Sequence, residues 1–155
     1  MVDSCVIVEM LVSLDQHRRE SSVHTLRAHD KRYRVVLPAL VLAEVTGSGA
    51  VRGDDGGQLA RSERIALAHE WVRSSDFLIA DITERVAKRA AGLATQFNLK
   101  GADACVLAVA AMWKCSTLFT WDHGLLKVGG SLDGLTVREP YVQGQVSLFG
   151  DSGVG

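Results

Sequence analysis

Short apolar segments alternate with helical segments along most of the chain, and this alternation limits the folds open to it. Four apolar segments are too short for core helices and read as buried strands, at residues 34–37, 76–80, 116–121 and 135–137. Strands that are joined through helices run parallel, and a parallel sheet needs helices over both faces. The sequence therefore predicts an α/β protein, a three-layer α/β/α sandwich with a short central parallel sheet.

The segments between the strands predict helices. Residues 81–97 begin with a capping box, in which Asp81 would cap the helix and Glu84 would be its partner. Residues 102–114 are almost wholly apolar, which is typical of a buried central helix. Residues 6–14 form either a helix after a very short first strand or the continuation of that strand, because periodicity does not separate the two. The other expected helices span residues 21–31, 39–45 and 59–74.

Two regions carry no clear structural signal. A single residue precedes the pair Val2 and Asp3, so the first strand is either a fragment at the edge of the sheet or one that begins upstream of Met1. Residues 47–58 hold five glycines and two adjacent aspartates, which predicts a loop. This loop either sets substrate or partner specificity or has no function.

The composition is that of one compact domain. A chain of 155 residues can bury a core without disulfides or metal. No apolar stretch reaches the roughly 18 residues of a membrane helix, and the N-terminus lacks the pattern of a signal peptide. Three cysteines in apolar runs fit reduced core thiols. We expect a cytoplasmic protein without a membrane partner, with a domain over residues 1–140 and a C-terminal tail over residues 141–155.

Four acidic residues fall beside apolar segments, at or near strand and helix ends. Asp3 ends the first strand, Glu44 lies about two turns into the helix after residue 37, Asp103 starts the apolar helix, and Asp122 follows the strand at 116–121. Each has an ordinary alternative: a solvated terminus for Asp3, an outward side chain for Glu44, a helix N-cap for Asp103 and a turn for Asp122. Because ligands bind at the carboxyl ends of parallel strands, we expect the four carboxylates to meet there.

Carboxylates that converge repel one another unless they take up protons or share a cation. A set of oxygen donors without histidine suits Mg²⁺ or Mn²⁺ better than zinc. Such ions serve phosphoryl chemistry, in which they activate water and stabilise charge on phosphate oxygens. A net charge of −1 argues against binding nucleic acid by bulk electrostatics, but bound metal ions would supply local positive charge.

The order and setting of these acids resemble the PIN-domain nucleases, especially the single-domain VapC toxins of VapBC toxin–antitoxin pairs. The resemblance rests on four segments, VDSCVIVEML, LPALVLAEV, GADACVLAVAAMW and LFTWDHGLLKV, which together cover most of the chain to about Pro140. It implies a PIN-like fold over residues 1–140 and a divalent-metal-dependent endoribonuclease. The products would carry a 5′-phosphate and a 3′-hydroxyl.

The resemblance also implies residue roles. Asp3 and Asp103 would bind the metal directly, Asp122 directly or through water, and Glu44 would orient or activate the attacking water. Thr120 matches the family's hydroxyl position and would support the ligands from behind. Cys5 stands where the family more often has Ser or Asn, which leaves Ser4 as the local hydroxyl. Lys100, just before Asp103, is the basic residue that we expect to contact substrate.

The partners implied by the resemblance are an RNA substrate (tRNA, rRNA or mRNA), a small cognate antitoxin and a second copy of the chain. A homodimer is expected also because apolar helices such as residues 6–14 must be covered. Two alternatives stay open. One is a housekeeping nuclease of RNA processing, and the other is a catalytically inactive PIN-like binding module.

Overall fold

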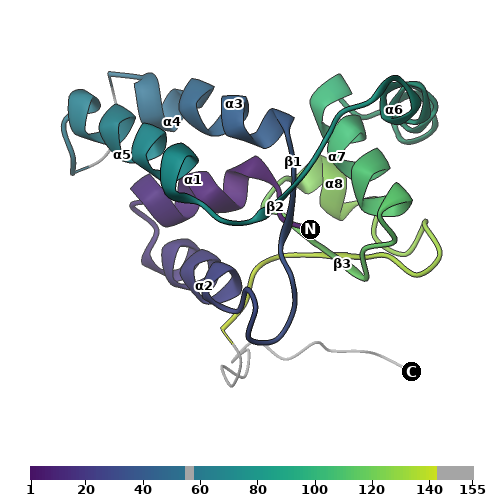
Figure 1. Ribbon diagram of the computed structural model, residues 1–155, viewed down its shortest axis with the longest axis horizontal. Coiled ribbons are helices and arrows are strands. Elements are labelled where there is room, and N and C mark those ends of the chain that lie inside the picture. The colour runs from purple at the N-terminus through teal and green to yellow at the C-terminus, as the bar shows by residue number, and fades with distance from the viewer. Residues whose placement is uncertain (55–57, 143–155) are drawn as a thin grey trace.

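A computed structural model describes residues 1–54 and 58–142 of the chain (Figure 1). Three residues of the predicted loop, 55–57, lie outside the described part. So does the predicted tail, apart from Tyr141 and Val142. The four predicted strands are all present, as β1 (Val36–Pro38), β2 (Leu78–Ala80), β3 (Thr117–Phe119) and β4 (Thr136–Arg138). The helices are α1 (Ser4–Val12), α2 (Gln16–Arg27), α3 (Leu40–Gly47), α4 (Gly49–Arg52), α5 (Arg61–Ser74), α6 (Glu84–Phe97), α7 (Gly101–Met112) and α8 (His123–Leu126).

The first three residues join two pairs of strands into one sheet. β1 pairs with β2, and β3 pairs with β4, both in parallel. Between the pairs, the Val2 N–H donates to the carbonyl of Val36 at 3.1 Å, and Val2 forms a parallel bridge with Phe119. The order across the sheet is therefore β2, β1, residues 1–3, β3, β4. The first strand lies in the middle of the sheet, so the prediction of an edge fragment is wrong.

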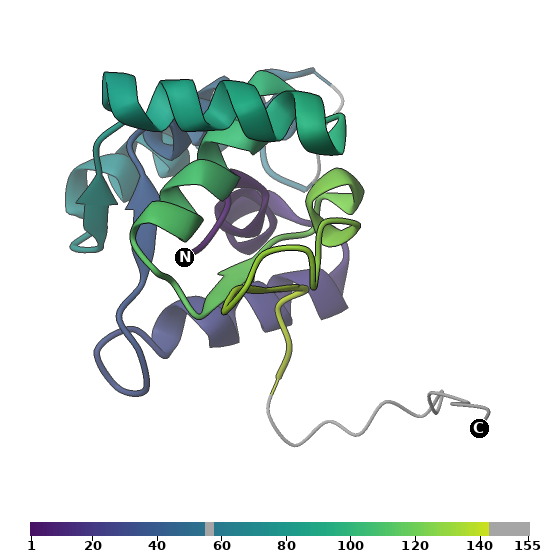
Figure 2. The same ribbon diagram turned by 90° about the vertical axis from the view of Figure 1, so that its right-hand side faces the viewer.

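Side chains alternate between the two faces of this sheet, and each face has its own core. Met1, Val36 and Leu118 belong to the core with α6 and α7, whereas Val2, Leu37 and Phe119 belong to the core with α1 and α3. In Figure 1 the helices α1 to α5 lie on one side of the strands and α6 to α8 on the other. In the turned view of Figure 2, α6 and α2 lie at opposite sides of the molecule with the N-terminus between them. The predicted three-layer α/β/α sandwich is confirmed. No helix within residues 1–54 and 58–142 is long and apolar enough to cross a membrane.

The starts of three helices depend on capping side chains. Asp3 caps α1, which decides for a helix, rather than a continued strand, after Val2. α2 begins five residues earlier than predicted because the Asp15 carboxylate accepts a hydrogen bond from the Arg18 N–H at 3.0 Å. The predicted cap of α6 is wrong, since Thr83 and not Asp81 accepts the hydrogen bond from the Val86 N–H.

Helix α1 packs inside the chain, against α2, α3, α4 and α5. Val6 and Ile7 are fully buried there. The start of the helix is thus covered within the chain, whereas Leu14 is 69% exposed, and a homodimer stays a prediction.

Part of the glycine-rich region is helical, where the sequence predicted a loop. Residues 49–52 form the short helix α4, capped by the Ser48 hydroxyl. Arg64 of α5 is only 2% exposed and packs against this region. Its guanidinium donates to the carbonyls of Val51 at 3.3 Å and Leu59 at 2.7 Å, and also to that of Gly53. A side chain outside the region thus binds the backbone of Val51 and Gly53 within it and of Leu59 just after it.

We expect Arg64→Met to destabilise the protein by about 2–4 kcal/mol. The substitution keeps the apolar stem but leaves three carbonyl groups without their donor, at a cost of about 1–3 kcal/mol for each one that stays buried. Urea unfolding followed by circular dichroism measures the difference. Arg73→Met, on the exposed side of the same helix, is the matched control and should change stability by less than about 0.5 kcal/mol. Equal stability of the two variants would show that Arg64 does not anchor this region.

Candidate active site

Asp3 is buried at the carboxyl end of the central strand. It is 5% exposed, so the alternative of a solvated terminus is wrong. Its Oδ1 accepts hydrogen bonds from the Ser4 N–H at 2.7 Å and from the Ser4 hydroxyl at 3.4 Å. Its Oδ2 accepts from the Thr120 hydroxyl at 2.7 Å and from the Cys5 thiol at 3.1 Å. The chain thus stabilises a carboxylate in a place where an unpaired one would be costly.

Thr120 links two of the candidate acids. Its fully buried hydroxyl donates to Asp3 and accepts a hydrogen bond from the Asp122 N–H at 2.9 Å. This contact fixes the β3–α8 connection against the first strand. The Asp122 carboxylate itself caps α8, because its Oδ1 accepts from the Leu125 N–H at 3.0 Å. The expected supporting position of Thr120 matches this geometry, and Asp122 does make an ordinary local capping contact.

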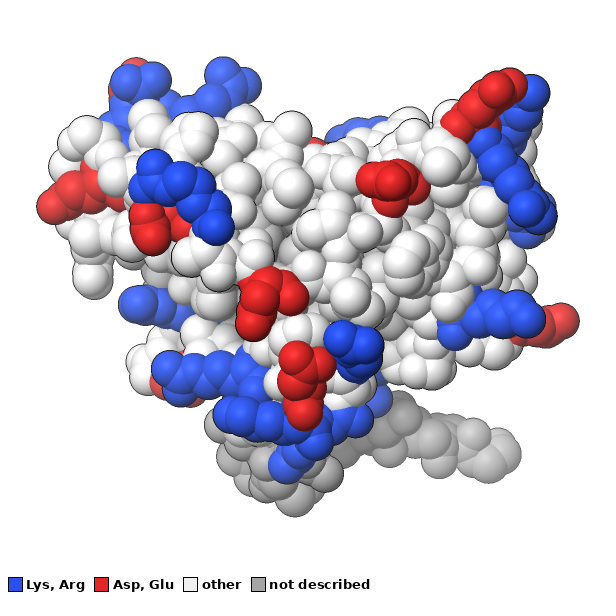
Figure 3. Space-filling view, in the orientation of Figure 1, with Lys and Arg blue, Asp and Glu red and all other residues white. Residues whose placement is uncertain are grey.

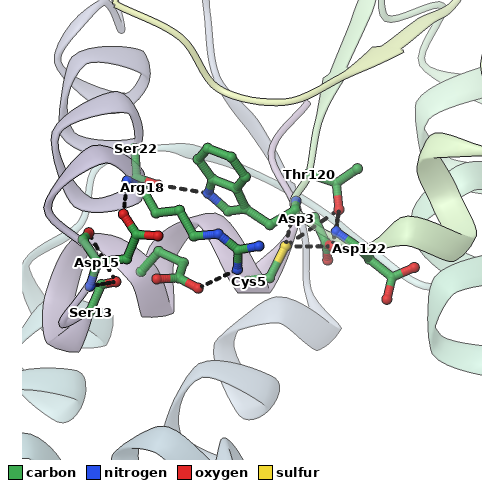
Figure 4. Close-up of polar contacts among 10 residues, drawn as sticks. Asp3, Cys5, Ser13, Asp15, Arg18, Ser22, Thr120 and Asp122 are labelled. Carbon is green, nitrogen blue, oxygen red and sulfur yellow. Dashed lines mark hydrogen bonds and ion pairs between the residues drawn. The ribbon is translucent and has the colours of Figure 1, made fainter. Parts of the chain in front are cut away.

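Cys5 contributes contacts that the sequence did not predict. Besides donating to Asp3, its sulfur accepts a hydrogen bond from the Trp121 N–H at 3.1 Å and lies 3.4 Å from the Thr120 hydroxyl (Figure 4). Burial, and then the negative charge of Asp3, raise the pKa of the thiol, so it stays protonated and acts as a donor. The position that the family more often fills with Ser or Asn is therefore occupied by another hydrogen-bonding group.

Glu44 lies in α3 and is half-buried. Its Oε2 is buried and has no hydrogen-bond partner among the described residues, so the alternative of an outward side chain is wrong. Burial raises the pKa of this carboxyl, the Ser4 hydroxyl opposes the shift, and the charges of Asp3 and Asp103 add to it. An orphaned buried oxygen with a raised pKa is typical of a group that functions with a proton or a cation.

Asp103 lies in the first turn of α7 and does not cap it. The N-cap is Lys100, whose side chain makes no capping bond, so the N-cap alternative for Asp103 is wrong. Burial raises the pKa of the Asp103 carboxyl, and the charges of Asp122 and Asp3 raise it further. Lys100, which is exposed, lowers it. Lys100 is thus near enough to act on Asp103, and its contact with substrate stays a prediction.

The four acids therefore share one electrostatic environment. Asp103 interacts with Asp122 and Asp3, and Glu44 interacts with Asp3 and Asp103. They come from the central strand, α3, α7 and the end of β3, which meet at the carboxyl edge of the sheet, where the strand order reverses. Repulsion therefore acts between pairs of these acids, and their use as one site stays a prediction.

The chemistry of these donors fits a divalent cation, but their spacing is more open than a closed metal site. All are oxygen donors, two have raised pKa values, and Glu44 has an orphaned oxygen. Within residues 1–54 and 58–142, however, no three acidic, histidine or cysteine side chains are grouped closely enough to hold an ion. Figure 4 shows one reason, since the Asp122 carboxylate points away from Asp3. Metal binding by Asp3, Asp103 and Asp122 stays a prediction.

Gly124 has a role that the sequence only hinted at, through the turn-like Asp-His-Gly. A Cβ atom at this position would lie 2.8 Å from Oδ1 of Asp122. Because real Cβ atoms essentially never come so close, a side chain here would displace the carboxylate. The glycine therefore leaves room for the Asp122 side chain in its capping position.

Side chains of α2 also contact Trp121, the residue between Thr120 and Asp122. The Trp121 ring is 6% exposed, and its Nε1 donates to the Ser22 hydroxyl at 3.0 Å. The Arg18 guanidinium lies 5.1 Å from the centre of this ring and pairs with Glu9 at 3.1 Å. These contacts fix the backbone on which Asp122 depends.

We expect metal-free Asp103→Asn to be at least as heat-stable as the wild type at neutral pH. A carboxyl whose pKa is raised by folding binds its proton more tightly in the folded state, so stability falls as pH rises through the raised pKa. The amide removes this loss. The advantage should vanish as pH falls below the ordinary value of 3.8. Thermal unfolding in EDTA over a pH series measures this, with exposed Asp133→Asn as the control. A lower melting temperature than wild type at pH 7 would contradict the expectation.

Comparison with known proteins agrees with the geometry. A family model described as PIN domain matches residues 1–131, a span that includes all four acids, Thr120 and four of the five sheet segments, all but β4. A search of curated proteins found no match. PIN domains are generally metal-dependent nucleases that use divalent ions such as Mg²⁺ or Mn²⁺. The match spans most of the chain, and the chain belongs to the PIN-domain family.

Proposed function

We propose that this protein is a Mg²⁺- or Mn²⁺-dependent endoribonuclease whose active site is the acidic edge of the sheet. The observation that carries the proposal is the group of four acids from distant parts of the chain, two of them with raised pKa values. Repulsion of this kind is costly to stability, and a bound divalent cation offsets it. The PIN fold independently favours a nuclease.

In this mechanism Asp3 and Asp103 would hold the metal, and Asp122 would bind it directly or through water. When bound, the cation supplies Lewis acidity for the attacking water and for the scissile phosphate. Glu44, whose pKa is raised, takes the proton of the water as its oxygen attacks phosphorus. The bond to the 3′-oxygen breaks, and that oxygen takes a proton from solvent. Exposed Lys100 neutralises a phosphate oxygen, while Ser4, Cys5 and Thr120 keep Asp3 in place.

We expect wild-type protein to cleave single-stranded RNA in Mn²⁺ and to lose this activity in EDTA. Asp103→Asn should lower the rate at least about 100-fold, since loss of a direct ligand should exceed the 10–100-fold loss typical of outer contacts. A gel assay with a 5′-labelled oligonucleotide measures the rate, and Asp133→Asn is the control. Equal cleavage by wild type and Asp103→Asn would refute the site. Absence of a thermal shift or heat on Mn²⁺ titration of wild type would favour the inactive binding module.

Within this class, we favour the toxin of a type II toxin–antitoxin pair over a housekeeping nuclease. A cavity of about 800 Å³ between α2, the end of α1 and the start of α5 fits a protein partner. Leu14 and Leu59 line it and are 69% and 39% exposed, and Arg19 and Arg27 add positive charge. An amphipathic acidic segment complements this lining, as the antitoxin would supply. A homodimer stays a proposal that rests on the resemblance to VapC toxins.

Expression in a bacterial host separates toxin from housekeeping enzyme. We expect wild-type protein alone to arrest growth, and Asp103→Asn to be tolerated. Co-expression of a small protein encoded immediately upstream should restore growth. Leu14→Asp places a charge in the cavity and should weaken the antitoxin at least about tenfold, because apolar anchors carry much of such binding, while RNA cleavage stays unchanged. Tolerated expression of active wild-type protein would favour the housekeeping alternative.

A further inference from the structure

The turn between α2 and β1 carries the sequence Lys31-Arg32-Tyr33-Arg34, and all four side chains are exposed. Asp30 is the acidic residue of this turn, and it pairs with Arg34 at 3.5 Å. Figure 3 shows Lys and Arg side chains gathered around acidic ones at the lower end of the molecule, below α2. Further Lys and Arg side chains lie at the upper left and upper right of this view. Three of the four residues in this turn are cationic, in a protein whose net charge is −1.

Hydrogen bonds fix the backbone of this turn. Asp30 has a positive φ of 55°, and its N–H donates to the carbonyl of Tyr33 at 3.0 Å. The Arg32 N–H donates to Ala28 at 3.0 Å. The ring of His29 accepts the Val35 N–H through Nδ1 at 2.9 Å. A ligand that binds the cations thus meets a turn that is already ordered, which lowers the entropic cost of binding.

A row of aromatic rings lies beside the cations. The ring of Tyr33 is 5.9 Å from that of Phe119, which is 6.4 Å from that of Tyr141. The Tyr33 hydroxyl donates to the carbonyl of Thr25 at 2.8 Å, so this ring is held in place. Phe119 is buried between the two tyrosines, which are 37% and 43% exposed. The guanidinium of Arg138 lies 4.1 Å from the centre of the Tyr141 ring.

We propose that the protein has a binding site for single-stranded RNA outside the catalytic centre. This site, which we call the basic aromatic patch, consists of Lys31, Arg32, Tyr33, Arg34, Arg138 and Tyr141. Cations on a rigid turn neutralise successive phosphates, and exposed rings stack with bases regardless of sequence. An acidic protein segment would use the charges but gains little from the rings. This inference rests on the proposed function in one respect, because it takes the natural ligand of the patch to be the RNA substrate of the nuclease.

The patch is linked to the candidate active site along the chain at the aromatic row, but its turn precedes β1, whereas Glu44 follows β1. Phe119, the middle of the aromatic row, precedes Asp122 by three residues, so their Cα atoms are at most about 10 Å apart. Arg138 and Tyr141 lie beyond residue 131, where the PIN-domain match ends. The patch is therefore partly built from residues that the family match does not include. RNA binding at the patch therefore does not depend on the acids.

RNA binding by Asp103→Asn protein in EDTA tests the patch without cleavage. Fluorescence anisotropy with a labelled ten-nucleotide single-stranded RNA, from 50 to 200 mM KCl, gives the slope of log K against log salt. The double variant Lys31→Ala with Arg34→Ala should reduce the magnitude of that slope by about 1.4, because each cation removed should contribute about 0.7. Tyr141→Leu should weaken binding about 5- to 150-fold at every salt concentration without changing the slope, because stacking does not release ions. Tyr141→Phe should restore binding.

Matched controls decide between this site and general charge. Arg85→Ala with Arg89→Ala removes two exposed cations from α6 and should leave the slope unchanged. An equal fall in slope for both double variants would overturn the proposal, and so would normal affinity of Tyr141→Leu. Polyglutamate is also added as a competitor of the labelled RNA. If it competes as strongly on Tyr141→Leu as on the protein without that change, the ligand of the patch is an acidic protein segment, and the RNA proposal is overturned. Because binding is measured without divalent ions, failure of the nuclease proposal would leave these results unaffected.

Discussion

The backbone hydrogen bonds of residues 1–3 hold the rest of the structure together. Val2 bonds to β1 on one side, and Asp3 and Met1 bond to Phe119 of β3 on the other, so these three residues close two separate strand pairs into one sheet. The same contacts place Asp3 where the strand order reverses, beside Thr120. Fold and site thus depend on a single short segment, because the residue that completes the sheet is followed at once by the residue that starts the acidic edge.

The acids on that edge are stabilised unequally. Asp3 accepts hydrogen bonds from Ser4, Cys5 and Thr120, whereas Glu44 keeps one buried oxygen without a described partner. Burial and repulsion raise the pKa values of Glu44 and Asp103. A well-bonded carboxylate suits a fixed ligand, and a carboxyl with a raised pKa suits a group that exchanges a proton. The inequality therefore supports different roles for acids that look equivalent in the sequence.

The sequence predicted those features whose signals are local. Short apolar runs predicted all four strands, and the setting of Asp3, Glu44, Asp103 and Asp122 predicted their common edge. It did not predict α4 in the glycine-rich region, where the side chain of Arg64, distant in sequence, donates to the carbonyls of Val51 and Leu59. It also failed to predict the direction of the Asp122 carboxylate, because capping of α8 competes with the site for the same oxygen. Alternation of apolar residues carries no information on either contact.

An acidic centre that acts on RNA faces a physical conflict, because the same carboxylates that would hold a cation repel the phosphates of the substrate. One cation neutralises the scissile region, but the flanking phosphates remain, and a net charge of −1 gives them no general attraction. Positive charge held away from the acids resolves the conflict, since it attracts the flanking strand without neutralising the metal ligands. The turn at residues 31–34 has this placement. The turn precedes β1 and Glu44 follows β1, so the sheet separates the cations from the acidic edge. If both proposals hold, separation of affinity from catalysis lets each surface keep the charge that it needs.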